Sequence, residues 1–517
     1  MSRIIQLSLP PQAAADEAAV RKACALQAGL QPASLTSLRI LKRSVDARHK
    51  NIRVNLSVEI FAGDEPDTFI EPFRITNVAS KREVIIVGAG PAGLFAALRL
   101  IELGIRPVII ERGKDVSARK VDIARISREH VVDPDSNYCF GEGGAGTYSD
   151  GKLYTRSKKR GDNQRVLELL CLHGANRNIL YEAHPHLGTD KLPGIISAIR
   201  KTIIDAGGLF LLEKRVTGLL INGNQINGVK TFGNESFLSP CVILATGHSA
   251  RDIYELCLSG NVDLEMKSFA MGVRVEHPQS LIDRIQYHGN ERGNYLPAAS
   301  YSLVRQVDGR GVYSFCMCPG GFIVPSATSQ EELVVNGMSP SNRNSPYANS
   351  GIVVEIRPED LGKYSAAGVL AGIEFQKELE RDAWINGGST QRAPAQRLAD
   401  FVAGKASVSL PRVSYFPGVT ASSLHEWLPQ EIGKRLMEGF SLFGKLMTGY
   451  LTNEAVILGV ESRTSSPVRI PRDPEKLNHI RVSGLYPCGE GSGYSGGIVS
   501  SAVDGMNVAE SLVRTIQ

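Results

Sequence analysis

The chain has 517 residues, 42% of them apolar and 21% charged, which is typical of a folded globular protein and excludes a disordered or collagen-like one. Its 58 basic and 53 acidic residues are well mixed and leave a formal net charge of +5, so nucleic-acid binding is not indicated. The densest basic run, residues 158–160, is expected to be a solvated loop. This length exceeds what one hydrophobic core usually organises, so we expect two or three domains.

The cysteines and the length of the apolar runs indicate the cellular compartment that we expect for the protein. Eight cysteines are scattered without the spacing of a disulfide framework, which favours a reducing, cytoplasmic setting. The first residues contain no apolar segment followed by a small-residue cleavage site, and no run of about 18 apolar residues occurs. We therefore expect neither export nor membrane insertion.

The first 78 residues are predicted to form a small α+β module. Apolar and polar residues alternate as in half-buried strands, and a helical pattern lies between the first two strands. The expected strands are 3–8, 37–44 and 52–61, and the expected helix is 17–30. The polar, proline-containing stretch 64–68 marks the end of the module, which carries no visible chemistry.

A βαβ unit follows. Residues 83–87 are a continuous apolar run that suits a buried parallel strand, and residues 107–110 read as the second strand. Between them, Ala97, Leu100 and Ile101 fall on one side of a helix. Further expected elements are a helix at 191–205, a hairpin series at 215–230 and a strand at 241–245.

Residues 265–455 differ in composition. Aromatic and β-branched stretches such as 311–315 and 351–356 are separated by Gly, Pro, Asn and Ser clusters, which predicts a largely antiparallel sheet. Helical stretches follow at 368–382 and 429–447. The last 35 residues return to an apolar strand, a glycine turn and a helix. We therefore predict a nucleotide-binding domain that the intervening segment splits in sequence.

The strongest motif is Gly88-x-Gly90-x-x-Gly93, which lies between the predicted strand and helix. Gly88 permits a tight turn, Gly90 lets the backbone approach a pyrophosphate, and Gly93 allows close helix–strand packing. A diphosphate would then lie on amides at the helix N-terminus. Glu111 ends the next strand 18 residues after Gly93, where it can accept hydrogen bonds from ribose hydroxyls. Because its carboxylate would repel a 2′-phosphate, NADP is disfavoured at this site.

Three segments resemble those of flavoproteins related to glutathione reductase and to the glucose-inhibited-division and aminoacetone-oxidase-like groups. Residues 242–247 resemble the second cofactor-side strand, which ends in Thr246-Gly247. Residues 484–491 resemble the C-terminal motif whose acidic residue binds the ribityl chain, with Glu490 where Asp is commoner. Residues 494–502 begin a helix whose N-terminus would point at the flavin and stabilise its anionic reduced form.

The whole chain is similar to a bacterial family of FAD-dependent dehydrogenases that carry a small N-terminal module. Segments 139–153, 316–321 and 461–469 carry this likeness, which implies FAD as cofactor and places the glycine-dense loop 141–146 beside the isoalloxazine. The expected fold is α/β: a Rossmann-type FAD-binding domain, split in sequence, with an inserted mainly antiparallel cap domain. The expected boundaries are 1–78 for the module, 79–264 and 456–517 for the FAD-binding domain, and 265–455 for the cap.

The expected FAD contacts combine the glycine motif with the segments that carry the resemblance. They are Gly88, Gly90, Pro91, Ala92, Gly93, Glu111, Arg112, Gly144, Val216, Thr246, Gly247, Gly489, Glu490, Gly497 and Ile498. No metal site is expected, because no paired Cys or His cluster has zinc-ligand spacing.

Four residues are candidates for chemistry. Lys152 could place a positive charge beside the flavin or a substrate anion, or it could be a surface lysine after a turn. Cys316 and Cys318 lie two apart, so on a strand both thiols would face one side, either as a redox pair or as small buried hydrophobic side chains. Arg463, with Arg469, could clamp an anion or bond backbone carbonyls.

His248 is the histidine nearest the inferred cofactor, although a structural role is commoner for such a residue, and no general base is assigned. The predicted function is an FAD-dependent oxidoreductase that transfers a hydride to or from an unidentified small molecule. Two alternatives are a flavin-binding sensor or partner-binding protein and an RNA-modifying flavoenzyme. No second Gly-x-Gly-x-x-Gly has strand–helix context, so NAD(P)H is a candidate electron donor without a dedicated domain.

Overall fold

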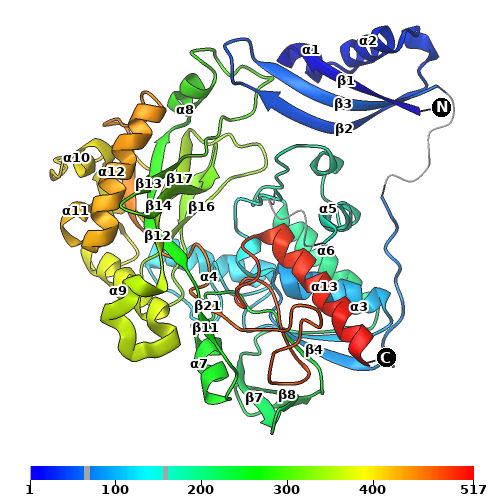
Figure 1. Cartoon of the computed structure of the whole chain (residues 1–517), viewed down its shortest axis with the longest axis vertical. Coiled ribbons are helices and arrows are strands. Elements are labelled where there is room, and N and C mark those ends of the chain that lie inside the picture. Colours follow the sequence, from blue (N-terminus) through cyan, green and yellow to red (C-terminus); the bar gives the residue numbers. More distant parts are fainter. Residues whose placement is uncertain (1, 63–69, 155–160, 517) are drawn as a thin grey trace.

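The computed structural model describes residues 2–62, 70–154 and 161–516. The polar stretch 64–68 and the basic run 158–160 therefore lie outside the described residues. Figure 1 shows three parts: a small N-terminal module in blue, a parallel-sheet domain that contains the C-terminal helix in red, and a large antiparallel sheet with yellow and orange helices beside it.

The N-terminal module is a three-stranded antiparallel sheet with two helices. Its strands pair in the order β1-β3-β2. The elements are β1 (Ser2–Leu9), α1 (Pro11–Ala15), α2 (Glu17–Ala28), η1 (Pro32–Ser34), β2 (Ser37–Asp46) and β3 (Arg53–Phe61). Every second residue of β3, from Val54 to Ile60, is buried against Cys24 and Ala25 of α2, so the module has its own small core. The α+β expectation for this segment is confirmed.

The second part is a five-stranded parallel sheet in the order β22-β10-β4-β5-β6. Its strands are β4 (Glu83–Val87), β5 (Arg106–Ile110), β6 (Leu209–Leu211), β10 (Val242–Leu244) and β22 (Leu485–Pro487). Alternate residues of β4 face opposite cores: Val84 and Ile86 pack on helices, and Ile85 and Val87 pack on a second antiparallel sheet. The chain leaves this sheet after β10 and returns to it at β22, with the cap strands in between, which confirms the predicted split.

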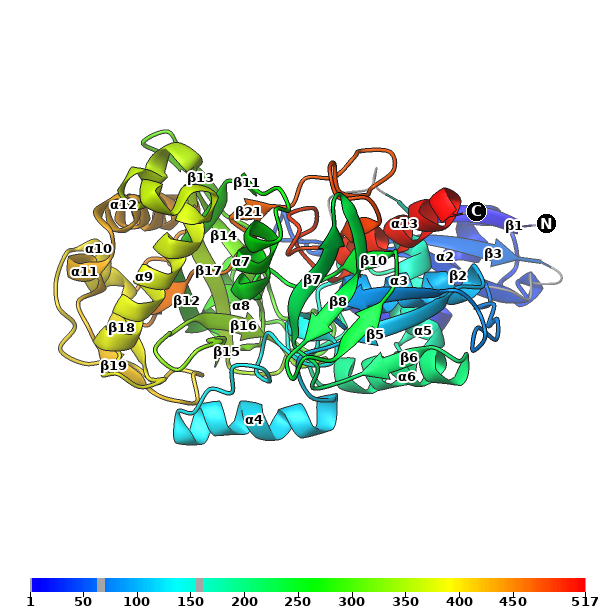
Figure 2. The ribbon, with the colours of Figure 1, turned by 90° about the horizontal axis from the view of Figure 1, so that it is seen from below.

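Helices cover one face of the parallel sheet, and a small antiparallel sheet covers the other. The helices are α3 (Pro91–Glu102), α5 (Asn163–Leu172), α6 (Leu192–Asp205) and α13 (Ile498–Ile516). The opposite face carries β7 (Val216–Asn222), β8 (Gln225–Thr231), β9 (Ser236–Leu238) and α7 (Arg251–Ser259). Helix α4 (Val116–Glu129) lies at the bottom of the view in Figure 2. The short turns η2 (Gly144–Gly146) and η3 (Arg177–Leu180) lie in the connections.

The cap is built on a seven-stranded sheet in the order β13-β14-β17-β12-β20-β18-β19, antiparallel except for the β18–β19 pair. Its strands are β12 (Phe269–Pro278), β13 (Val304–Val307), β14 (Arg310–Cys318), β17 (Tyr347–Ile356), β18 (Ala393–Arg397), β19 (Val419–Ala421) and β20 (Val456–Glu461). Two short ribbons accompany it, β15 (Phe322–Pro325) with β16 (Val335–Met338) and β11 (Glu265–Met266) with β21 (Val468–Arg469). The expected antiparallel cap is confirmed.

Helices pack on the side of this sheet that faces away from the parallel-sheet domain (Figures 1 and 2). They are α8 (Gln279–Gln286), η4 (Pro358–Leu370), α9 (Ala371–Asn386), α10 (Leu398–Val402), α11 (Leu424–Trp427) and α12 (Gln430–Leu446). The sheet also buries polar side chains: Arg274 of β12 bonds Glu461 of β20 at 2.7 Å and Asn349 of β17 at 2.6 Å. Its third partner is the backbone carbonyl of Cys316, which lines the pocket described below.

The expected domain boundary at 455/456 differs from the structure. Strand β20 pairs with β12 and β18 in the middle of the cap sheet, so the cap continues past residue 455. All six residues of β20 are buried. A short apolar run that is buried on both faces reads the same in a parallel and in an antiparallel sheet, which is why composition assigned it to the FAD-binding domain.

Some features are absent from the described parts of the chain. None of the helices there combines the length and apolar character needed to cross a membrane. No group of three or more His, Cys, Asp or Glu side chains in those ranges could hold a metal ion. All eight cysteines are described, and all are free thiols.

Candidate cofactor and active site

A long pocket lies between the parallel-sheet domain and the cap. At one end it is lined by the β4–α3 turn and the ends of β5 and β10, and at the other by Phe315 and Cys316 of β14. We call the part near Glu111 and Val216 the adenosine end and the part near Lys152 and Cys316 the cap end. The remaining wall comes from the glycine loop 144–146 and from Gly496, Gly497 and Ile498 at the start of α13.

The glycine turn fits a diphosphate. Gly88 has φ +105, and a Cβ there would lie 2.7 Å from the Ala245 carbonyl oxygen. A Cβ on Gly93 would lie 2.0 Å from the Gly88 oxygen, so this glycine serves helix–strand packing and does not line the pocket. A Cβ on Gly90 would meet no protein atom within 4 Å, so this position opens into the pocket. Helix α3 begins at Pro91 without a side-chain cap, which leaves its first amides available to an anion.

Glu111 lines the pocket and braces its walls. One carboxylate oxygen accepts a hydrogen bond from the Ala89 amide at 2.8 Å, and the other accepts from the Gly113 and Gly141 amides at 3.0 Å. The residue is only 6% exposed. A carboxylate offers about four acceptor positions, so one remains for a ribose hydroxyl beside the three backbone bonds. Sequence reasoning proposed a ribose contact for Glu111 and did not foresee these three backbone bonds.

The adenosine end also contains Arg112 and Val216. The Arg112 guanidinium lies 4.2 Å from the centroid of the Phe140 ring and bonds Asp135 at 2.8 Å and Asp252 at 3.0 Å. These partners occupy its donors, so Arg112 contributes a fixed planar surface to this end rather than an unpaired charge.

The glycine loop and α13 form the wall opposite the cap. The Gly143 amide bonds the Ala89 carbonyl at 2.9 Å, and a Cβ on Gly144 would lie 3.1 Å from the Gly90 Cα, so the two loops need glycines to approach this closely. Gly497, just before the 19-residue helix α13, has no protein atom within 4 Å of an added Cβ. The helix therefore directs its positive end into the pocket.

Glu490 lies in the pocket wall beside the end of β10. Its Oε1 is 3.3 Å from Nδ1 of His248, which follows the pocket-lining Thr246 and Gly247. The loop is held by the Tyr254 hydroxyl, which donates to the Gly491 carbonyl at 2.7 Å. Gly489 does not line the pocket, because it packs against α3, where an added Cβ would be 2.9 Å from the Ala92 Cβ.

The two cysteines do not face one side. Cys316 has φ +44, and a β-bulge between Phe315 and Cys318 interrupts the strand alternation on which the sequence expectation rested. Cys316 lines the pocket, whereas Cys318 is fully buried and donates to the Cys316 carbonyl at 3.1 Å. Burial raises the pKa of the Cys318 thiol to about 12, so it is neutral at pH 7. The bulge thus gives the two thiols different surroundings.

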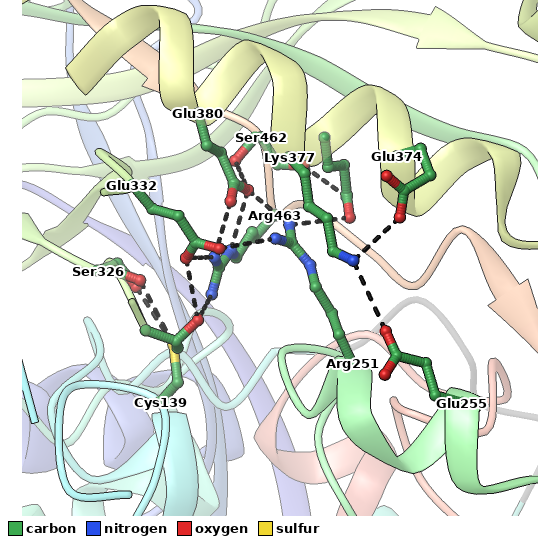
Figure 3. Close-up of polar contacts among 12 residues, drawn as sticks. Cys139, Arg251, Glu255, Ser326, Glu332, Glu374, Lys377, Glu380, Ser462 and Arg463 are labelled. Carbon is green, nitrogen blue, oxygen red and sulfur yellow. Dashed lines mark hydrogen bonds and ion pairs between the residues drawn. The ribbon is translucent and has the colours of Figure 1, made fainter. Parts of the chain in front are cut away.

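Arg463 is engaged by carboxylates and cannot act as a free anion clamp. Its guanidinium bonds Glu380 at 2.8 and 3.0 Å and Glu332 at 2.7 Å, and the side chain is 5% exposed. Figure 3 shows both carboxylates pointing at Arg463, with Arg251 reaching toward them from α7. Arg251 bonds Glu380 at 2.8 Å. Arg463 therefore has a structural role, but it bonds carboxylates and not the backbone carbonyls that the structural alternative named, and it borders the pocket. Arg469, its suggested partner, is not among the lining residues and lies over the Tyr494 ring at 5.7 Å.

Lys152 lies at the cap end. Its Nζ is 3.1 Å from Asp150 Oδ2 and 3.9 Å from the Cys318 sulfur. Burial opposes its charge, but the nearby Cys318 and Asp150 outweigh burial and raise the pKa of Lys152. Burial would likewise raise the pKa of the Asp150 carboxyl, but Lys152 and Arg343 hold it well below its usual range. Both groups are therefore charged at neutral pH.

Sequence reasoning missed several residues of this pocket. Asp150 was read only as part of a turn, although its spacing of two from Lys152 was a usable signal. Asn336 and Phe315 reach the pocket from cap strands, and no local pattern indicates that. The charged cluster around Glu380 joins residues far apart in the chain, so it leaves no short motif.

Together, the parallel sheet, the open glycine turn and the long pocket define a dinucleotide-binding protein. Residues 268–464 match a family model described as "FAD-dependent protein, C-terminal domain-like", and residues 81–124 match one described as "FAD binding domain". Residues 1–61 match a domain of unknown function. An "Uncharacterized protein" of Clostridium beijerinckii is 40% identical over 500 residues, which cover 93% of each chain. The chain belongs to the same family as this clostridial protein.

More distant matches carry the names of enzymes. Thiamine thiazole synthase of Aeropyrum pernix is 27% identical over 198 residues, which cover 35% of this chain and 61% of that one. Among solved structures, L-proline dehydrogenase from P. horikoshii is 13% identical with a TM-score of 0.36 and covers 84% of this chain and 94% of that chain. Glycine oxidase from Bacillus cereus is 13% identical with a TM-score of 0.32, over 84% and 96%. At these TM-scores the likeness carries no conclusion about activity.

FAD is therefore the cofactor of this chain, as expected from the sequence. The residues present fit it: open glycines at Gly90 and Gly497 give backbone approach, and the uncapped first turn of α3 can receive a diphosphate. When bound, FAD supplies hydride and single-electron transfer, so the chain is an FAD-dependent oxidoreductase.

Proposed function

We propose that the protein is a dehydrogenase or reductase in which a small organic molecule exchanges a hydride with FAD at the cap end of the pocket. The observation that carries this is the position of the cap: Phe315, Cys316 and Asn336 line the same pocket as the open glycine turn. Cap strands thus enclose a chamber beside the cofactor site, and such a chamber can exclude water from a hydride transfer.

The residues named above as expected FAD contacts are part of this proposal. Thirteen of the fifteen line the pocket, and Gly93 and Gly489 support it from behind through close packing. Arg112 lines it as a paired, stacked side chain. The closer relationship to the glutathione reductase superfamily also remains a proposal, supported by Glu490 at the pocket wall.

The electron donor belongs to the proposal as well. NAD(P)H is proposed to reduce FAD without a dedicated nucleotide domain, since the described sheets contain one glycine-motif βαβ unit. A cytoplasmic setting is supported by the eight free thiols. Nucleic acid is not proposed as a partner, and the basic run that would favour it lies outside the described residues.

The test begins with the purified protein. We expect bound FAD, visible as flavin absorbance, and its anaerobic bleaching by NADH or NADPH faster than free FAD is bleached. A colourless protein that does not take up FAD would contradict the cofactor assignment. Bound FAD that no nicotinamide donor reduces, together with retention of a cellular partner, would favour a sensor, and salt-dependent RNA retention would favour an RNA-modifying enzyme.

A further inference from the structure

The positive charges that line the pocket are not equivalent. At the adenosine end, Lys214 pairs with Glu235, and Arg215 is 3.3 Å from Asp135. Arg112 and Arg463, described above, each face two carboxylates. Arg112 and Arg215 share Asp135 but have Asp252 as a second carboxylate. Lys152 is different, because Arg343 lies 3.8 Å from the same Asp150 oxygen and the described residues give this pair of cations no second carboxylate. Two cations thus divide one carboxylate at the cap end.

The other groups around Asp150 do not cancel this charge. His186 Nε2 lies 3.9 Å from Asp150 Oδ1, but burial and then Arg343 lower the pKa of His186 to about 4, so its ring is neutral at pH 7. The two thiols nearby, Cys316 and Cys318, have pKa values raised by burial and are neutral as well. Arg274 and Glu461, on the cap sheet above, form a one-to-one pair. The described residues at the cap end therefore carry one excess positive charge.

Lys152 presents this charge to the cavity. Its side chain is 37% exposed and lines the pocket, whereas Asp150 is 6% and His186 8% exposed behind it. The lysine is also held in place: Leu153 donates to the Pro185 carbonyl at 2.9 Å, and Lys152 and His186 form a β-bridge. An ammonium on such a fixed ribbon is a preorganised donor with capacity left beyond Asp150.

We propose that Lys152 binds an anionic group of the substrate, a carboxylate carried on an apolar body, and that Asp150 is a positioning residue behind it. This rests on the proposed function and names its substrate class. The apolar body is inferred from Phe315, a residue that lines the same end of the pocket. A carboxylate there would replace solvent as the partner of the Lys152 donor and neutralise the excess charge.

The proposal is tested with the FAD-loaded protein and benzoate as probe, followed by the change in flavin absorbance. Benzamide, which has the same shape without the charge, is the matched ligand control. Lys152→Met is expected to weaken benzoate binding by about tenfold or more, the scale of a charge-assisted hydrogen bond, and to leave benzamide binding unchanged. Lys152→Arg should retain part of the benzoate affinity, because the charge remains.

Asp150→Asn is expected to change the benzoate affinity in the opposite direction. Removing the carboxylate that competes for Lys152 should tighten benzoate binding several-fold, whereas a purely structural role would weaken it. Lys201→Met, which breaks an exposed ion pair with Asp205 on α6, is the matched control and should leave the benzoate affinity unchanged. FAD content and thermal midpoint are measured for each variant, so that misfolding is recognised.

Equal benzoate affinity in wild type and Lys152→Met, or in the equally neutral Lys152→Gln if the Met variant does not fold, would overturn the anion site. So would absence of benzoate binding in a protein that holds FAD and is reduced normally, and this result would leave the proposed function intact. A protein that holds no FAD would instead overturn the proposed function, and the inference with it.

Discussion

Gly90 and Gly93 belong to one motif but do different work. Gly93 packs against the end of β4, whereas Gly90 opens into the pocket. Gly93→Ala should therefore destabilise the fold by about 1–3 kcal/mol or more, because its methyl group would overlap the Gly88 oxygen. Gly90→Ala should leave the unfolding midpoint of the FAD-free protein unchanged but weaken FAD binding by about tenfold, since its methyl group occupies the approach to the diphosphate.

Thermal unfolding without FAD and FAD titration of the same two variants separate these effects. If Gly90→Ala bound FAD as tightly as the wild type, the diphosphate would not lie on this turn.

Glu111 has two roles that a substitution removes together. Glu111→Ala should weaken FAD binding by roughly 1.5–3 kcal/mol, the scale of hydrogen bonds to a charged group. It should also lower stability, because the amides of Ala89, Gly113 and Gly141 lose their acceptor. FAD titration of the apoprotein measures the first effect and denaturant unfolding the second. Glu129→Ala, at the exposed end of α4, is the control, and equal FAD affinity in both variants would argue against the ribose contact.

At the scale of elements, the cluster around Glu380 ties three segments together. Arg251 is the first residue of α7, Glu380 lies on α9, and Arg463 lies in the segment after β20. Glu380 is fully buried and also accepts from the Ser462 hydroxyl at 2.6 Å. The cluster thus joins the FAD-binding domain to the cap next to the pocket.

Glu380→Ala should lower the free energy of unfolding by about 3–5 kcal/mol, because it leaves two arginines buried without their shared carboxylate. Glu378→Ala on the same helix is the matched control. Its partner Lys363 is exposed, so its loss should cost at most about 1 kcal/mol. Urea unfolding at pH 7 compares them, and similar values for both variants would show that the cluster does not stabilise the interface.

The same carboxyl makes stability depend on pH. Burial would raise the pKa of Glu380, but Arg251 and Arg463 outweigh it and lower that pKa to about 2, from 4.5. The unfolded chain therefore takes up a proton first as the pH falls. The contribution of Glu380 is complete above pH 4.5 and is lost progressively toward pH 2. Between pH 4.5 and pH 2, the free energy of unfolding should fall less steeply with decreasing pH in Glu380→Gln than in the wild type. Denaturant unfolding at several pH values in this range measures the difference.

The sequence predicted elements well where one local signal decides them. The βαβ unit has apolar strands, a glycine turn and an acidic strand end within thirty residues, and the structure contains it as predicted. Strand β20 was assigned to the wrong domain because burial on both faces hides the sheet type. The bulge at Cys316 depends on pairing with β17, and Arg463 acquires its carboxylates from distant segments, so neither could be read from neighbouring residues.

At the scale of the whole molecule, the N-terminal module touches both larger parts, and none of its described residues lines the pocket. Arg43 exchanges backbone hydrogen bonds with Tyr181 and Ala183 of the FAD-binding domain. On the other side, a ring nitrogen of His288 in the cap lies 2.8 Å from the Ala47 carbonyl. The lining residues of the pocket all lie between 87 and 501. The module is thus a bridge between two domains rather than part of the site.

Deleting residues 2–61 should therefore leave the FAD content unchanged and lower the thermal midpoint. The module has a core of its own, and only Ile52 and the partly buried Ala47 pack against the core of the cap, so its removal should disturb the cap locally and leave the pocket lining in place. Flavin absorbance per chain and a melting curve measure the two effects. Loss of FAD from the shortened protein would show that the module shapes the cofactor site from a distance.

The order of the strands in the parallel sheet bears on how the protein is made. Strand β4 ends at Val87, but its sheet is completed by β22, which begins at Leu485, and by α13 behind it. During synthesis, the glycine turn is made early. The residues at the start of α13 that line the same pocket are made only after the entire cap. We therefore expect FAD to be bound only after β22 and the start of α13 have been made, and messages cut short before β22 should yield colourless chains.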